Sequence, residues 1–136
     1  MDVLIVERDE LVGTMLADTL DAEGISAALV SDEEAEKVLQ DDAPQLVITS
    51  LNRGHNEDLA GLQVVSAMRR KWPQLCAIYL SALWPARLHP ERLTAGERFL
   101  TKPVPLTRLI RTVRELLDSG FCHRHTRRER SSLPHQ

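Results

Sequence analysis

The chain has 136 residues, of which 43% are hydrophobic and 27% are charged, and its formal net charge is −3. This length suits a single domain, and the apolar content excludes disorder for the bulk of the chain. No apolar run reaches the ~18–20 residues of a membrane span, and the Met-Asp start lacks the basic region of a secretion signal. Two cysteines are too few for a disulfide scaffold. We therefore expect a cytoplasmic protein with no membrane segment.

The charge is distributed unevenly along the chain. Residues 1–58 hold 3 Lys and Arg against 15 Asp and Glu, whereas residues 59–136 hold 14 against 5. The two halves can lie side by side in one folded domain, so this asymmetry does not indicate two domains. The acidic half argues against a uniformly basic protein that binds nucleic acid.

The first 40 residues predict two strand–helix units. Residues 3–6 are wholly apolar, as in a strand buried on both faces of a sheet. Apolar side chains then recur every three or four residues over 10–24, which predicts a helix capped at its C-terminus by the final glycine. After a second apolar stretch at 27–30, residues 31–40 begin with a capping box, Ser-Asp-Glu-Glu, and predict a second helix.

Three more strands follow, at residues 46–49, 76–80 and 99–101. A helix between the first two of them carries its apolar residues on one face and stops at Pro73. The segment 82–96 contains two prolines, which forbid a long regular helix. The apolar stripe of residues 106–117 predicts a last helix that ends at Gly120.

Strands that alternate with helices, each strand a continuous apolar run, predict a parallel sheet covered on both faces. We expect an α/β fold, a flavodoxin-like doubly wound sandwich with a five-stranded parallel sheet and a shortened or irregular fourth helix. This domain would span residues 1–120. Residues 121–136 are rich in arginine and lack apolar periodicity, which predicts a basic, disordered tail. In such a fold, binding sites form at the carboxyl ends of the strands.

Polar residues follow four of the predicted strands: Glu7, Arg8 and Asp9 after the first, Ser50 after the third, Ser81 after the fourth, and Lys102 and Pro103 after the fifth. The segments Val3–Glu7, Pro44–Leu51, Leu80–Ala82 and Phe99–Pro103 resemble the four signature regions of bacterial response-regulator receiver domains. The resemblance covers roughly residues 2–119, and its strength is the order of the four segments.

The resemblance implies a role for each matching position. In that family a pair of acidic residues and an Asp bind Mg²⁺, and the Asp takes a phosphoryl group from a histidine kinase. Glu7 matches the first acidic position, while Ser81 and Lys102 match the hydroxyl and the lysine that contact the phosphoryl oxygens. Pro103 matches the family's usual cis proline, and Phe99 an aromatic position linked to switching.

Two departures remove this chemistry. Arg8 stands at the second acidic position and Ser50 at that of the phosphoacceptor Asp. A serine hydroxyl is a poor nucleophile without an adjacent base, and Mg²⁺ prefers carboxylate and carbonyl oxygens. With Glu7 and Lys102, these residues sum to one net positive charge, and Arg8 is placed to set its guanidinium near Glu7. We expect no enzymatic activity and weak or absent Mg²⁺ binding.

Simpler interpretations stand beside these functional ones. Glu7, Asp9 and Lys102 form either a residual anion or metal site or an internal salt bridge between Lys102 and Glu7. Ser50 and Ser81 are more simply small polar residues that fill a former phosphate pocket than sites of hydroxyl phosphorylation. In the family the fourth helix, fifth strand and fifth helix form the output and dimer face. Here the double-proline segment 83–92 replaces much of the fourth helix, so the family's partner and dimer geometry are not carried over.

Two features are candidates for contacts with a partner. Arg108, Arg111 and Arg114 recur every three residues on the polar side of the last helix, where they dock an acidic partner or form a solvated face. Trp84 is either a partner anchor or a cover for the shortened fourth helix.

Our hypothesis is an atypical receiver of a two-component or phosphorelay system, which acts by protein–protein interaction without Asp phosphorylation. The expected partner is a signalling protein, a histidine kinase or another regulator, and a homodimer stays open. The alternative is a regulator that binds nucleic acid through the Arg-rich last helix and tail, although the overall composition argues against nucleic acid. A flavin or nucleotide binder has the least support.

Overall fold

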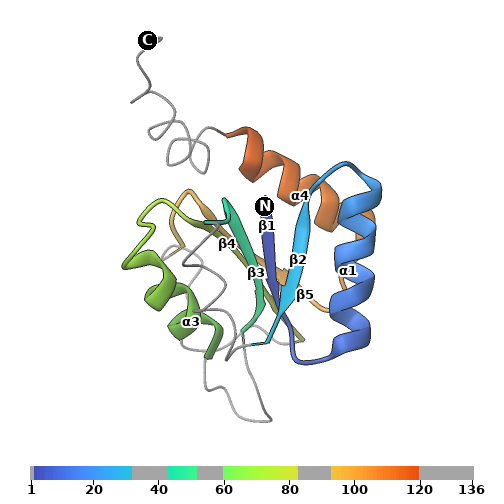
Figure 1. Ribbon diagram of the computed structural model, residues 1–136, viewed down its shortest axis with the longest axis horizontal. Helices are drawn as coiled ribbons and strands as arrows, with labels where there is room; N and C mark the ends of the chain where they lie inside the picture. Colours follow the sequence, from blue (N-terminus) through green and yellow to red (C-terminus); the bar gives the residue numbers. More distant parts are fainter. Residues whose placement is uncertain (1, 32–42, 52–59, 83–92, 120–136) are drawn as a thin grey trace.

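The computed structural model describes residues 2–31, 43–51, 60–82 and 93–119, and Figure 1 draws the remaining residues as a thin grey trace. Three predictions lie outside the described residues. These are the helix over 31–40, the proline-containing segment 83–92 with Trp84, and the basic tail at 121–136.

A single parallel sheet forms the centre of the molecule (Figure 1). Its strands are β1 (Val3–Val6), β2 (Ala27–Val30), β3 (Leu46–Ser50), β4 (Cys76–Ser81) and β5 (Glu97–Thr101). They pair in the order β2-β1-β3-β4-β5, with Val3 opposite both Ala27 and Leu46. The chain therefore adds β2 on one side of β1 and β3 on the other, which places the topological switch point between β1 and β3. The predicted five-stranded, doubly wound parallel sheet is confirmed.

The central strands are buried on both faces, as their unbroken apolar sequences predict. All four side chains of β1 and all six of β4 are buried. The fifth strand begins at Glu97, two residues before the expected start at Phe99. The sequence pattern missed this start because Glu97 and Arg98 are charged, and charged residues are rare in a strand that is covered on both sides.

Three helices are described: α1 (Glu10–Ala22), α3 (Ala60–Arg69) and α4 (Leu106–Asp118). Figure 1 shows α1 and α4 on one face of the sheet and α3 on the other. Leu16 and Leu20 of α1 share one buried cluster with Leu109 and Val113 of α4, whereas α3 packs into a second cluster on the opposite face. Among the described residues, none of the helices has the length and apolar character needed to cross a membrane.

The face covered by α3 contains a buried polar network at the β4–β5 edge. The Tyr79 hydroxyl donates to Glu97 Oε2 at 2.6 Å, and Arg69 NH1 lies 3.2 Å from the same oxygen. The Thr94 N–H donates to Glu97 Oε1 at 3.0 Å, while Arg69 also donates from Nε and NH2 to the Leu75 carbonyl. The strand can therefore start with a carboxylate, because each of its oxygens has a partner.

These contacts shift the pKa values of the network. Burial raises the pKa of the Tyr79 hydroxyl, and the hydrogen bond to Glu97 raises it further. Burial alone would raise the pKa of Glu97 as well. The hydrogen bonds from the Thr94 N–H and the Tyr79 hydroxyl, together with the charge of Arg69, outweigh burial and lower the pKa of Glu97 below its usual 4.5.

We expect Glu97→Gln to lower the free energy of unfolding at pH 7 by about 1–3 kcal/mol, because a buried, charged acceptor is lost. The pKa of Glu97 is lower in the folded chain than its usual 4.5, so the charged form stabilises the fold above that pH. This contribution disappears as the pH falls through the folded pKa. Urea unfolding of both proteins across this range should therefore show a difference that shrinks with acidification.

The exposed Glu115 provides a matched control, since Glu115→Gln removes the same charge without breaking a described ion pair. This variant should unfold like the wild type at every pH. A difference between Glu97→Gln and the wild type that stayed constant from pH 7 to pH 3 would contradict the proposed role of the Glu97 charge.

Candidate functional site

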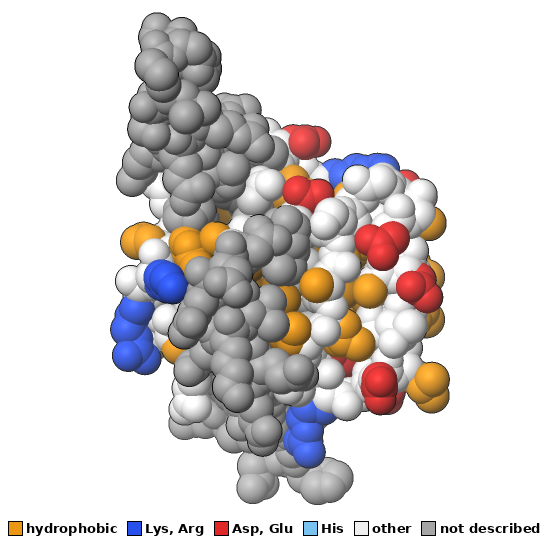
Figure 2. All heavy atoms as spheres, viewed as in Figure 1, with side chains coloured by type: hydrophobic (Ala, Val, Ile, Leu, Met, Phe, Trp, Pro, Cys, Tyr) orange, Lys and Arg blue, Asp and Glu red, His pale blue; other side chains and the backbone are white. Residues whose placement is uncertain are grey.

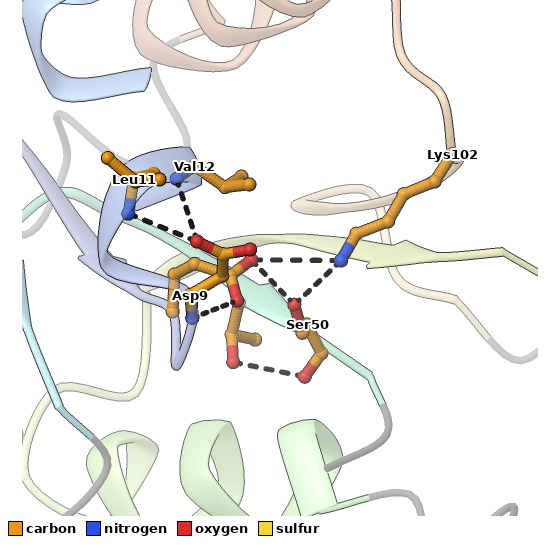
Figure 3. A network of polar contacts seen from close by, with 7 residues as sticks. Asp9, Leu11, Val12, Ser50 and Lys102 are labelled. Atoms are coloured by element: carbon orange, nitrogen blue, oxygen red, sulfur yellow. Dashed lines mark hydrogen bonds and ion pairs between the residues drawn. The ribbon is translucent and has the colours of Figure 1, made fainter. Parts of the chain in front are cut away.

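The carboxyl ends of β1, β3 and β5 bring three polar side chains together (Figure 3). The Ser50 hydroxyl donates to Glu7 Oε1 at 3.0 Å, and Lys102 Nζ donates to Ser50 Oγ at 3.2 Å. Lys102 Nζ also lies 3.7 Å from Glu7 Oε1, which closes the network. The predicted salt bridge between Lys102 and Glu7 is confirmed.

Both carboxylate oxygens of Glu7 accept hydrogen bonds. Oε1 accepts from Ser50 and faces Lys102, while Oε2 accepts from the Asp9 N–H at 3.0 Å. The Glu7 side chain is only 8% exposed, whereas that of Lys102 is 37% exposed. The carboxylate is thus withdrawn from solvent and compensated by one cation and two hydrogen bonds.

Asp9 has a structural role that our sequence analysis missed. Its Oδ1 accepts from the Leu11 and Val12 N–H groups at 3.1 and 3.2 Å, so Asp9 is the N-cap of α1 (Figure 3). The signal was present, because an Asp directly before the first apolar residues of a helix is a preferred N-cap. On sequence alone, Asp9 is placed beside Glu7 and Lys102, as part of either a residual anion or metal site or an internal salt bridge, and no capping role is predicted.

Ser81 is hydrogen-bonded to the backbone of Lys102, and Pro103 directly follows Lys102 in the chain. Ser81 ends β4 opposite Thr101 and is 7% exposed. Its carbonyl accepts from the Lys102 N–H at 2.8 Å, which fixes the backbone from which the Lys102 side chain reaches Ser50. The Lys102–Pro103 peptide bond is cis, as the sequence resemblance implied.

Arg8 and Phe99 are two further residues that the sequence analysis singled out. Arg8 is exposed, and the prediction that its guanidinium lies near Glu7 stays a prediction. Phe99 is partly buried and packs against the cluster on the α3 face. The ion-pair partner found for Glu7 is Lys102.

Helix α3 begins against the backbone of the site. The Gly61 N–H donates to the Leu51 carbonyl at 2.9 Å, and the Leu51 N–H donates to the Leu80 carbonyl at 2.8 Å. A Cβ atom at residue 61 would lie 2.5 Å from the Ser50 carbonyl oxygen and 3.0 Å from Leu51 Cα. Glycine is therefore required here for the close approach of the helix to Ser50.

The carboxylates at these strand ends accept hydrogen bonds from groups of the protein itself. Within the described residues no three His, Cys, Asp or Glu side chains are grouped so that they could hold a metal. The two carboxylates nearest the site, Glu7 and Asp9, already accept from Ser50 and from backbone N–H groups. The ammonium of Lys102 also lies against the Glu7 oxygen that a cation would need.

The Ser50 hydroxyl is held as a bridge between two charged groups. Its proton is directed at Glu7, and Lys102 donates to one of the two lone pairs of the oxygen. The ammonium hydrogen bond withdraws electron density from the oxygen, whereas the Glu7 carboxylate accepts the hydroxyl proton. Chemically, the network is a stable ion pair bridged by a hydroxyl.

The predicted arginine stripe of α4 divides into two parts. Arg114 NH2 lies 2.8 Å from Glu23 Oε1 and donates to the Glu23 carbonyl, which ties α4 to the end of α1. Arg108 and Arg111 line a groove between α4 and β5. Two of the three arginines thus remain candidates for contacts with a partner.

Comparisons with known proteins identify the fold. No family model and no curated protein sequence matches the chain. Solved structures do match. The chemotaxis protein CheY4 of Vibrio cholerae has 20% identity and a TM-score of 0.70, over 85% of this chain and 97% of that one. The receiver domain of NtrX from Brucella abortus has 22% identity and a TM-score of 0.72, over 86% and 98%.

A CheY-like response regulator receiver domain protein of Methanospirillum hungatei has 19% identity and a TM-score of 0.74, over 87% of this chain and 94% of that one. The matches extend over almost the whole length of these proteins. At such identities the likeness establishes the fold, which is the CheY-like, flavodoxin-like fold of receiver domains.

We expect Gly61→Ala to destabilise the protein by about 1–3 kcal/mol, because the new methyl group meets backbone atoms that cannot move aside cheaply. Gly13→Ala is the matched control in a second helix. Its Cβ would lie 2.5 Å from Leu29 Cδ1, the end of a flexible side chain, and alanine favours a helix. Urea unfolding should rank Gly61→Ala well below Gly13→Ala; equal values would contradict the close packing at Ser50.

The ion pair should appear as energetic coupling between Glu7 and Lys102. Lys102→Met leaves a largely buried carboxylate without its cation, and Glu7→Gln removes the charge that needs it. In a double-mutant cycle measured by urea unfolding, we expect a coupling of about 0.5–2 kcal/mol, limited by the exposure of Lys102. Additive effects of the two substitutions would show that the pair is not formed in solution.

Proposed function

We propose that this chain is a receiver-like module of two-component signalling that acts by binding a partner protein, without phosphoryl transfer to residue 50. One observation carries the proposal. The hydroxyl of Ser50 stands between Glu7 and Lys102, at the strand end where the sequence resemblance implies a phosphoacceptor carboxylate. The fold shared with receiver domains and the signature segments at four strand ends support the signalling role.

The loss of phosphotransfer follows from the chemistry of the site. An acyl phosphate requires a carboxylate, and residue 50 is a serine. The Ser50 hydroxyl donates to the Glu7 carboxylate, which is a weak base and is already compensated by Lys102 and the Asp9 N–H, so it is poorly suited to activate the hydroxyl. Transfer to this hydroxyl would also have to break the network that compensates the buried Glu7 carboxylate.

The proposal includes the absence of bound Mg²⁺. The Lys102 ammonium already balances the charge of Glu7, and Arg8 adds a second positive charge at the neighbouring position. A divalent cation would have to displace Lys102 from Glu7. It would also need further oxygen ligands from Ser50, which now donates to Glu7, and from Asp9, which now caps α1. The protein is accordingly proposed to be a binding module and not an enzyme.

Without a phosphoryl group, a partner has to supply the signal. A ligand or partner shifts a two-state protein only by its difference in affinity for the two states. A histidine kinase or another regulator remains the expected class of partner, and a homodimer stays open.

We expect an amide NMR titration with Mg²⁺, followed by beryllofluoride as a mimic of the phosphoryl group, to leave the resonances of Glu7, Ser50 and Lys102 unchanged. Mass spectrometry after incubation with Mg²⁺ and acetyl phosphate should find no added phosphoryl group. Saturable shifts at these three residues, or a phosphorylated product, would contradict the proposal.

The variant Arg8→Asp with Ser50→Asp is the matched control. It places carboxylates at both departing positions and leaves Glu7, Ser81 and Lys102 in place. We expect this variant to respond to Mg²⁺ and beryllofluoride. A silent double variant that is still folded would show that the pocket lacks the receiver arrangement, and the signalling assignment itself would then fail.

A further inference from the structure

Cys76 is a cysteine in the interior of the fold. It is the first residue of β4, it is fully buried, and it lies opposite Leu46 of β3. Its N–H donates to the Gln45 carbonyl at 3.1 Å, so its backbone is fixed against the start of β3. The Cys76 sulfur is part of a disulfide. The sequence contains one other cysteine, Cys122, which lies outside the described residues.

Helix α4 leads the chain back toward Cys76. Figure 1 shows that its C-terminal end lies at the edge of the sheet where β1 begins, which in a parallel sheet is also the edge where β4 begins. Leu116, in the last turn of α4, is fully buried and shares one cluster with Cys76 and Leu46. Since a chain can cover ~3.3–3.6 Å per residue, residue 122 can bring its Cα within the ~4.4–6.8 Å of the Cys76 Cα that a disulfide requires.

The last turn of α4 is stabilised poorly by its own residues. Glu115 and Asp118 place negative charge at the negative end of the helix dipole, and this turn contains no basic residue. The N–H and the hydroxyl of the C-cap, Ser119, both donate to the Leu116 carbonyl, at 3.3 and 2.7 Å. These hydrogen bonds stay within the turn, so they do not attach it to the sheet.

Helix α1 provides one polar contact to α4, the ion pair between Glu23 and Arg114. The two side chains are 41% and 50% exposed, and exposed pairs contribute little to stability. Figure 2 shows acidic side chains over α1, which contains no basic residue. Helix α1 therefore offers no cation to Glu115 or Asp118. A stronger attachment of the end of α4 has to come from another part of the fold.

We propose that Cys76 and Cys122 form one intramolecular disulfide, and that this bond is a thiol-dependent switch on the end of α4. In the oxidised chain, the segment that follows α4 is joined covalently to a central strand. In the reduced chain, the end of α4 depends on its buried apolar side chains and on the exposed Glu23–Arg114 pair. The inference goes beyond the proposed function, because neither the signalling role nor the Ser50 site requires this bond.

The bond forms by thiol–disulfide exchange with a small-molecule disulfide, here oxidised glutathione. Because the Cys76 sulfur is buried, the Cys122 thiolate reacts first: it attacks one glutathione sulfur, and the other glutathione leaves as a thiolate. The Cys76 thiolate then attacks the Cys122 sulfur of this mixed disulfide and expels the second glutathione thiolate. Both cysteine thiols lose a proton and are oxidised, while one glutathione disulfide is reduced to two thiols.

Thiol labelling of the full chain tests the pairing. The protein is equilibrated with oxidised glutathione, freed of it, denatured and treated with N-ethylmaleimide. We expect an intact mass with neither maleimide nor glutathione attached, and maleimide on both cysteines once a phosphine has reduced the chain. Without reduction, a tryptic digest should contain peptide 72–87 joined to peptide 115–124, which carry Cys76 and Cys122.

The variant Cys76→Ala separates the two steps of the exchange. It leaves Cys122 without a second thiol that could displace glutathione, so this variant should retain one glutathione after the same treatment. The wild type should retain none, because Cys76 completes the exchange.

Thermal unfolding and amide hydrogen exchange test the switch. The oxidised wild type should melt about 5–15 °C above the reduced protein, because a cross-link between distant residues restricts the unfolded chain. On reduction, exchange should accelerate more in residues 113–119 than in β1, since local opening is easiest at an unattached helix end. Cys122→Ser is the matched control: it should melt like the reduced wild type and should not respond to the reductant.

Four outcomes would overturn the proposal. They are free thiols in the denatured chain after oxidation, glutathione retained on both cysteines of the wild type, a disulfide that joins two chains, and equal melting temperatures of the oxidised and reduced wild type. None of these measurements involves Mg²⁺, a phosphoryl donor or residue 50, so their failure is distinct from a failure of the proposed function.

Discussion

The parallel pairing of apolar strands is the constraint on which the rest of this structure depends. Because every strand points the same way, all carboxyl ends meet at one edge of the sheet, and the side chains of β1 and β4 are buried along their whole length. Residues as far apart in the sequence as Glu7, Ser50 and Lys102 are thereby brought within hydrogen-bonding distance. The identity of three side chains then decides what that edge can do.

At this edge the three polar side chains form a closed network of hydrogen bonds and an ion pair. The Ser50 hydroxyl donates to Glu7 and accepts from Lys102, so it bridges the ion pair. The Asp9 N–H donates to the second oxygen of the Glu7 carboxylate. Such an ion pair, with a largely buried carboxylate and a partly exposed cation, contributes little net stability, but the loss of the cation leaves the carboxylate uncompensated. On the surface between β5 and α4, Arg108 and Arg111 form no ion pair with a carboxylate of the described residues.

Much of the fold followed from sequence periodicity, because buried parallel strands and amphipathic helices have distinct patterns. The exceptions have local causes. The start of β5 at Glu97 was not predictable, because no sequence pattern shows that Tyr79, Thr94 and Arg69 contact its carboxylate. For the site, strand-end position and family resemblance predicted the Glu7–Lys102 pair. The division of the α4 arginines was not predictable, because it requires the knowledge that α1 ends beside α4.

The sharing of one buried cluster by the first and last described helices has a consequence for synthesis of the protein. Leu109, Val113 and Leu116 are fully buried in one cluster with Val3 and Ile5 of β1, which are made at the start of synthesis. Until α4 emerges, the part of this face that α1 does not cover exposes apolar side chains, in a state open to chaperones and to aggregation. A chain that ends shortly before residue 106 is therefore expected to aggregate and not to fold as a smaller functional domain.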